Sequence, residues 1–163
     1  MTPTATSTAT PTPTGITFGL NPTTSQHVVG DIFQITIQVA TGSQQIDGAE
    51  VHITFDPTKL QVTDAAGNPV AKITPNTTSL ELTLSNNVNN TTGQIDYVAG
   101  TLQSPLPSGN ITLATITFKA IAATPAGATP LTFLTSGPGT VTRVTFGGSA
   151  LPVTVSPGSV TIQ

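Results

Sequence analysis

The stretch AEVHITFDPTKLQV, residues 49–62, decides the fold. Its first half alternates apolar and polar side chains, which is the period-two pattern of a β-strand with one buried face. The alternation places Val51, Ile53 and Phe55 on the buried side. It leaves Glu50 and His52 on the outer side, where a partner could reach them.

The same stretch predicts where that strand ends. Pro57 has no amide hydrogen to donate to a neighbouring strand, so the strand has to stop in front of it. The Asp56 side chain can accept hydrogen bonds from backbone amides just ahead of it and form a tight turn. We therefore expect Asp56 to be a turn residue, with Leu60 and Val62 re-entering the core after it.

Alternating segments with short turns between them recur along the rest of the chain. Nine are expected to be strands: residues 30–40, 49–55, 79–85, 93–100, 110–122, 129–135, 140–146, 151–155 and 158–163. Many short strands at regular spacing, without an amphipathic helix, are typical of a sandwich. The sequence therefore predicts an all-β protein, an antiparallel nine-stranded β-sandwich with jelly-roll topology.

Phase along the strands predicts the core. Twelve side chains are expected to be buried: Phe33, Ile35, Ile37, Val51, Ile53, Phe55, Leu60, Leu82, Leu84, Ile95, Ile116 and Phe118. In the segment 110–122 the apolar residues change sides between Leu113 and Ala114. Such a phase change predicts a β-bulge or a strand that passes from one sheet to the other.

Composition excludes several classes of function. The chain has four Lys and Arg residues in 163 and a net charge of −3, so it lacks the clustered cations that nucleic acid needs. It has no cysteine and no apolar run of the roughly 20 residues that span a membrane. Neither histidine nor any acid lies in a motif for catalysis or metal binding. We expect no enzyme activity, no cofactor, no metal and no membrane insertion.

The chain divides into two parts by composition. Residues 1–14 form a Thr/Pro-rich segment, which predicts an extended linker. The alternative is that this segment pairs with a sheet edge of a neighbouring subunit. Residues 15–163 carry the strand pattern and are expected to form one domain.

Five motifs in order resemble the cohesin family. They are GDIFQITIQV at 30–39, the strand ending in Phe-Asp-Pro and followed by Leu-x-Val, GQIDYVAG at 93–100, ATITFKA at 114–120 and GSVTI at 158–162. The resemblance spans about residues 16–163. It implies a non-catalytic module that holds a dockerin, a small module that carries the calcium, and so anchors a partner protein to an extracellular scaffold or cell surface.

The resemblance also places the dockerin contact on the outer side of one sheet. Alternation gives that surface four candidate partner-binding residues, Glu50, His52, Asp96 and Val98. In many cohesins an Asn and an Asp begin the motif strand and contact the dockerin, and the matching positions here are Gly48 and Glu50. Because the amide is missing, the partner need not be one of the well-known dockerins.

Two other functions remain open at this point. One is a structural subunit or stalk domain of a surface layer, adhesin or filament, in which the domain would associate with itself. The other is a carbohydrate-binding module, which commonly stacks exposed aromatic rings on sugars. The chain has no Trp, and alternation places its one Tyr, Tyr97, on the inner side. Both observations argue against a carbohydrate-binding module.

Overall fold

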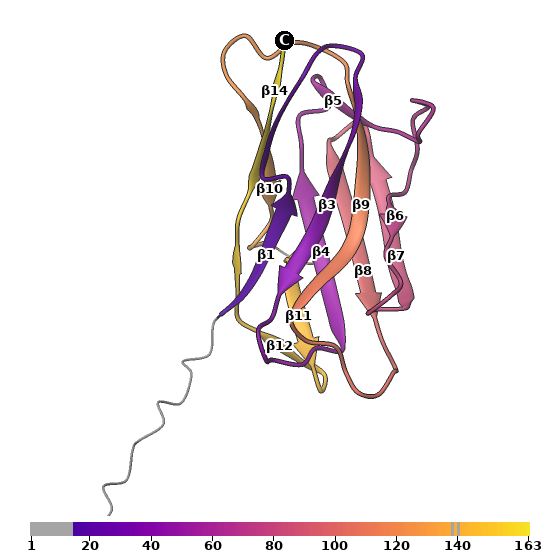
Figure 1. The fold of residues 1–163 in the computed structure, drawn as a ribbon, viewed down its shortest axis with the longest axis vertical. Helices are drawn as coiled ribbons and strands as arrows, with labels where there is room; N and C mark the ends of the chain where they lie inside the picture. The colour runs from indigo at the N-terminus through magenta and orange to yellow at the C-terminus, as the bar shows by residue number, and fades with distance from the viewer. Residues whose placement is uncertain (1–14, 138, 140) are drawn as a thin grey trace, which may run out of the picture.

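A computed structural model describes residues 15–137, 139 and 141–163 (Figure 1). The predicted linker, residues 1–14, lies outside the described residues. Within them there is no helix that could cross a membrane. The strands are β1 (Ile16–Asn21), β2 (Thr24–His27), β3 (Ile32–Ala40), β4 (Gly48–Thr54), β5 (Leu60–Val62), β6 (Thr74–Pro75), β7 (Leu82–Asn89), β8 (Gln94–Gly100), β9 (Asn110–Ala120), β10 (Thr129–Phe133), β11 (Arg143–Phe146), β12 (Ser149–Leu151), β13 (Val153–Val155) and β14 (Gly158–Ile162).

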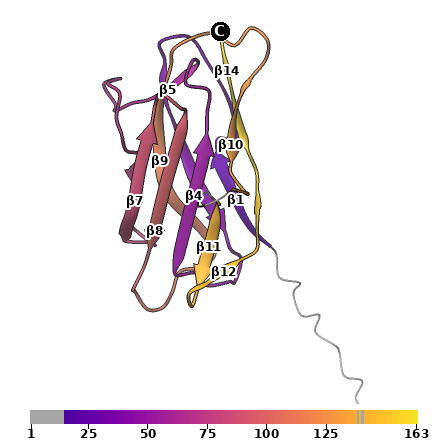
Figure 2. The same cartoon turned by 180° about the vertical axis from the view of Figure 1, so that it is seen from behind.

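Two sheets pack face to face, as the views from both sides show (Figures 1 and 2). The first has the order β13-β1-β3-β9-β5, with β6 beside β9. The second has the order β12-β11-β4-β10-β14-β2, with β8 along the other edge of β4 and β7 beyond β8. Most neighbours are antiparallel, while β1 with β13 and β14 with β2 are parallel. The all-β sandwich predicted from the alternation is confirmed, and the structure adds five short strands to the nine expected ones, namely β1, β2, β5, β6 and β12.

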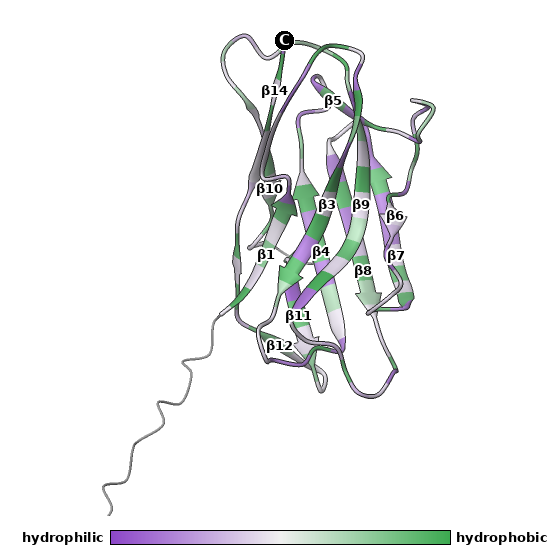
Figure 3. Ribbon diagram, viewed as in Figure 1, coloured by the Kyte–Doolittle hydropathy of each residue, from purple (hydrophilic) through white to green (hydrophobic). Residues whose placement is uncertain are grey.

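The core lies between the sheets and is built by the alternation that the sequence shows. Hydrophobic and hydrophilic residues alternate along β3 (Figure 3), and its apolar side chains are buried. Of the twelve side chains predicted to be buried, ten are. Phe55 packs edge-on against Phe118, with ring centroids 5.4 Å apart. Tyr97 also faces inward as predicted and has no exposed surface, and burial raises the pKa of its hydroxyl.

The phase change in β9 is a β-bulge, one of the two alternatives that the sequence predicted. The register with β3 shifts so that Ile37 pairs with Ala114 and Gln38 with Thr112, which leaves Leu113 as the extra residue. Both Leu113 and Ala114 are therefore buried although they are adjacent in sequence. The bulge lets one strand keep its apolar side inward across a change of phase.

The prediction that Leu82 and Leu84 are buried is wrong. Leu82 is 38% exposed and Leu84 is 69% exposed, whereas Leu80 is buried. Leu80 lies between the turn at residues 77–79 and the start of β7, so the three leucines do not share one strand. In addition, the pairing of β7 with β8 is irregular between Thr83 and Ser85, which leaves Leu84 as the residue without a partner. Leu82 pairs with Gly100, on the outer side of β8, so the apolar alternation that begins at Leu80 gave the wrong phase for β7.

The turn after β4 forms as predicted. One carboxylate oxygen of Asp56 accepts hydrogen bonds from the amide of Thr58 at 2.8 Å and from its hydroxyl at 2.6 Å. These hydrogen bonds hold the pKa of Asp56 below its ordinary value. Leu60 and Val62 then return to the core in β5. The Asp56 carboxylate is thus engaged in hydrogen bonds within its own turn.

Candidate functional site

The candidate site is the outer face of β11, β4, β8 and β7, called here the outer face (Figure 2). These strands are neighbours in one sheet, and β4 runs between β11 and β8. On this face Glu50 lies opposite Val98, and His52 lies opposite Asp96. Residues opposite each other in an antiparallel pair point to the same side of the sheet. The structure therefore brings all four predicted residues together.

Charged and polar side chains form a continuous row across the outer face. Arg143 on β11 contacts one carboxylate oxygen of Glu50 through Nη2 at 2.6 Å and Nε at 2.7 Å. The other Glu50 oxygen lies 2.9 Å from Nε2 of His52. Nδ1 of His52 lies 2.6 Å from Oδ1 of Asp96, which also accepts a hydrogen bond from Gln94 at 3.0 Å. We call these five residues the polar row.

His52 is the centre of the polar row and differs from the expectation of an accessible contact residue. Its side chain is on the outer side of β4 but only 6% exposed, because Glu50 and Asp96 enclose it. With both carboxylates ionised, each contact is a hydrogen bond only if the facing ring nitrogen carries a proton. His52 therefore positions the two acids and has little surface left for a partner.

The two acids are not equally available. Glu50 is 18% exposed and both of its oxygens are already occupied, by Arg143 and by His52. Asp96 is 31% exposed, and its second oxygen has a longer contact, 3.3 Å, with Gln94. A partner's donor can therefore reach Asp96 more readily than Glu50.

Sequence reasoning missed three residues of the outer face. Arg143 was expected on a strand, but its pairing with Glu50 joins positions 93 residues apart in the chain. Gln94 lies at the start of β8, where its outward direction follows from the same alternation as that of Asp96. Leu84 was assigned to the core and is instead exposed on this face, beside Gly100.

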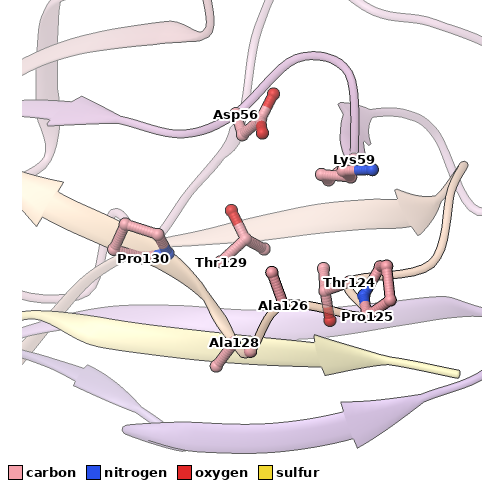
Figure 4. Close-up of a pocket in the computed structure, with 9 residues that line it drawn as sticks. Asp56, Lys59, Thr124, Pro125, Ala126, Ala128, Thr129 and Pro130 are labelled. Atoms are coloured by element: carbon pink, nitrogen blue, oxygen red, sulfur yellow. The ribbon is translucent and has the colours of Figure 1, made fainter.

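A concave region that includes no residue of the polar row lies beside the turn after β4 (Figure 4). It has a volume of about 380 Å³ and is bounded by the turn with Asp56 and Lys59 and by the loop 124–130. The loop contributes prolines, alanines, a glycine and threonines. The Asp56 carboxylate already accepts a hydrogen bond from the Thr58 hydroxyl. This concave region therefore does not place an unengaged acid next to a base.

The residues that the structure describes contain no group of three or more His, Asp or Glu side chains placed to hold a metal ion. The outer face thus combines a continuous sheet surface, a polar row and exposed apolar side chains. That mixture is typical of a surface for protein contact.

The sequence matches the family model for the cohesin domain over residues 18–160, and the chain belongs to the cohesin family. Cohesin domains are non-catalytic protein-binding modules with a jelly-roll β-sandwich fold. No curated protein matches the sequence.

Solved structures agree with this assignment. The third cohesin of ScaC from Acetivibrio cellulolyticus, in complex with the ScaB dockerin, is 15% identical with a TM-score of 0.69 and covers 90% of this chain and 98% of its own. The second type II cohesin module of ScaA from the same organism is 25% identical with a TM-score of 0.65 over 89% and 88%. The OlpC cohesin from Clostridium thermocellum, solved with the dockerin Doc435, is 12% identical with a TM-score of 0.67 over 96% and 99%.

Proposed function

We propose that this domain binds the dockerin module of another protein through its outer face. The observation that carries the proposal is the match to the cohesin family over residues 18–160, together with similar structures solved as dockerin complexes. In this role the domain anchors the partner to an extracellular scaffold or cell surface. Calcium belongs to the dockerin in this proposal, and the described residues of this chain form no cluster for it.

The geometry of the outer face supports the same function. Four neighbouring strands give a continuous surface, and Asp96 offers a partly exposed carboxylate beside Val98. The polar row satisfies most of its own hydrogen bonds, so its side chains hold fixed positions before a partner arrives. Preorganised groups lose less conformational freedom on binding than flexible ones do.

A carbohydrate-binding function has less support. Stacking on sugar rings needs exposed aromatic side chains. Within the described residues Tyr97, Phe55 and Phe118 are buried, and Phe146 is 40% exposed. A single exposed ring does not make a stacking platform.

The proposal is tested by capture from the secreted proteins of the source organism. The domain is immobilised, bound proteins are eluted with a calcium chelator, and mass spectrometry identifies them. A matched bait carries Asp96→Lys and Glu50→Lys. Dockerin-bearing proteins on the wild-type bait alone would support the proposal, and a recombinant dockerin module from one of them should bind in calorimetry. Recovery of this domain itself, without dockerins, would instead favour a structural subunit.

A further inference from the structure

We propose that a hollow on the outer face receives one large apolar side chain of the docking partner, an inference that rests on the proposed function. The hollow has a volume of about 230 Å³ and lies where β11, β4, β8 and β7 run side by side. Six residues that line it carry the argument: Gly48, Gly100, Leu84, Val98, Arg143 and Thr145.

Two opposite glycines form the floor of the hollow. Gly48 on β4 pairs directly with Gly100 on β8, so the two central strands have no side chain at this level. Neither glycine has a positive φ, so the backbone conformation does not require glycine at either position. Glycine inside a strand weakens it and commonly marks a place where another group approaches closely.

The neighbouring side chains leave little spare room at the floor. A Cβ at Gly48 would lie 2.6 Å from the Thr145 hydroxyl, which hydrogen-bonds to Asp47. A Cβ at Gly100 would lie 3.2 Å from the backbone oxygen of Asp47 and 3.7 Å from Cδ1 of Leu84. Glycine at these positions therefore lets Thr145 and Leu84 lie close against the backbone, and a side chain added at either position would change the shape of the hollow.

The walls of the hollow are apolar side chains, apart from polar side chains that are already engaged, such as Arg143, which forms an ion pair with Glu50. Leu84, which lies on the outer side of β7 with Leu82, is 69% exposed, and Val98 is partly exposed beside it. The charged wall is Arg143, whose guanidinium is held by Glu50. An occupant therefore meets exposed Leu84 and Val98 surface and a guanidinium that is already neutralised, which favours a large apolar side chain.

The charge of the outer face argues for a different protein as the source of that side chain. Asp47 and Glu50 lie at the hollow and Asp96 lies further along the face, whereas among the described residues of these strands Arg143 is the one Lys or Arg side chain on this face. Two copies docked through this face would bring like charges together, which is unfavourable across an interface. Large apolar side chains seated in pockets near the centre of an interface carry a large share of binding energy.

The test uses the recombinant, calcium-loaded dockerin module identified by the capture experiment, titrated by calorimetry into the chain of residues 1–163. Leu84→Ala removes a wall of the hollow, and Gly100→Ala begins to fill it. Each should weaken binding about tenfold. The matched control is Leu102→Ala, because Leu102 is 87% exposed and does not line the hollow. The control should change affinity by less than about twofold, as expected for a residue outside the hot spot. Thermal melts and circular dichroism confirm that each variant is folded.

The possible outcomes separate this inference from the proposed function. If the wild type binds the dockerin and both hollow variants keep its affinity, the inference is overturned and the function stands. An equal loss in Leu102→Ala would also overturn it, since the effect would not be specific to the hollow. Sedimentation that shows a wild-type dimer lost in Leu84→Ala would assign the hollow to a second copy. If no dockerin is captured or bound, the proposed function itself fails.

Discussion

His52 on β4 and Asp96 on β8 lie directly opposite each other, and their side chains meet with Nδ1 2.6 Å from Oδ1. Because the second ring nitrogen of His52 faces Glu50, one nearly buried side chain connects two acids on neighbouring strands. The arrangement makes His52 a positioning residue for the outer face.

We expect His52→Ala to destabilise the domain by about 1–3 kcal/mol, the cost of leaving partly buried polar groups without their partner. Urea unfolding followed by fluorescence or circular dichroism measures this change. The control is Ser85→Ala, on the same face but at the edge strand β7. A loss for His52→Ala no larger than that of the control would show that the polar row does not contribute to folding.

Phe55 should be among the most costly positions to truncate. Its side chain is 5% exposed and packs against Phe118, so Phe55→Ala should cost about 3–5 kcal/mol in unfolding free energy. Phe146→Ala is the matched control because Phe146 is 40% exposed. A change under about 1 kcal/mol at Phe55, the usual effect of a surface substitution, would contradict the assigned strand phase.

Strand phase could be read from the sequence wherever one strand keeps one buried side. It was right for Phe33, Ile35 and Ile37 on β3 and for Val51 and Ile53 on β4. It failed at Leu82 and Leu84 because Leu80 lies before β7, and β7 then pairs with β8 so that Leu82 faces outward opposite Gly100. A regular apolar repeat reveals neither the start of the strand nor its register.

The site was predictable only in part for a similar reason. Alternation placed Glu50, His52, Asp96 and Val98 outward, and the register put them together. It could not show that Arg143 neutralises Glu50, since that contact depends on β11 pairing with β4 across 93 residues. Nor could it show that two glycines would be opposite each other, which requires the register of β4 with β8.

Asp56 should make stability depend on acid pH. Hydrogen bonds from the Thr58 hydroxyl and amide lower the pKa of Asp56 from its ordinary value of 3.8 in the folded state. A carboxyl whose pKa is lower in the folded protein stabilises it above the ordinary pKa, and this contribution is lost as the pH falls through the folded pKa. Asp56→Ala should therefore be less stable than the wild type at neutral pH, with the difference shrinking below pH 3.8. Urea midpoints measured across that range test the sign, and a difference that stays constant would contradict it.

Residues 1–14 should be dispensable for folding. The segment consists of Thr, Pro, Ala and Ser after Met1 and offers no large apolar side chain beyond that residue. A chain that starts at Gly15 should melt at nearly the same temperature as the full chain. A marked fall in melting temperature, or the loss of an assembled state in sedimentation, would favour pairing of this segment with a neighbour's sheet edge.

Reversing the charge at Glu50 should weaken dockerin binding at least about tenfold, the range expected when a charged group within an interface is disrupted. Glu50→Lys would place an ammonium beside the guanidinium of Arg143 and would remove the acceptor of His52 Nε2. The repulsion would displace Arg143 and disturb Asp96 through His52, so the effect would spread along the polar row. Calorimetry with the calcium-loaded dockerin from the capture experiment gives the affinity, and a thermal melt shows whether the variant is folded. Asp31→Lys, which makes the same change of charge on the turn before β3, should leave the affinity unchanged. If folded Glu50→Lys binds as tightly as the wild type, the dockerin contact lies on another surface of the sandwich.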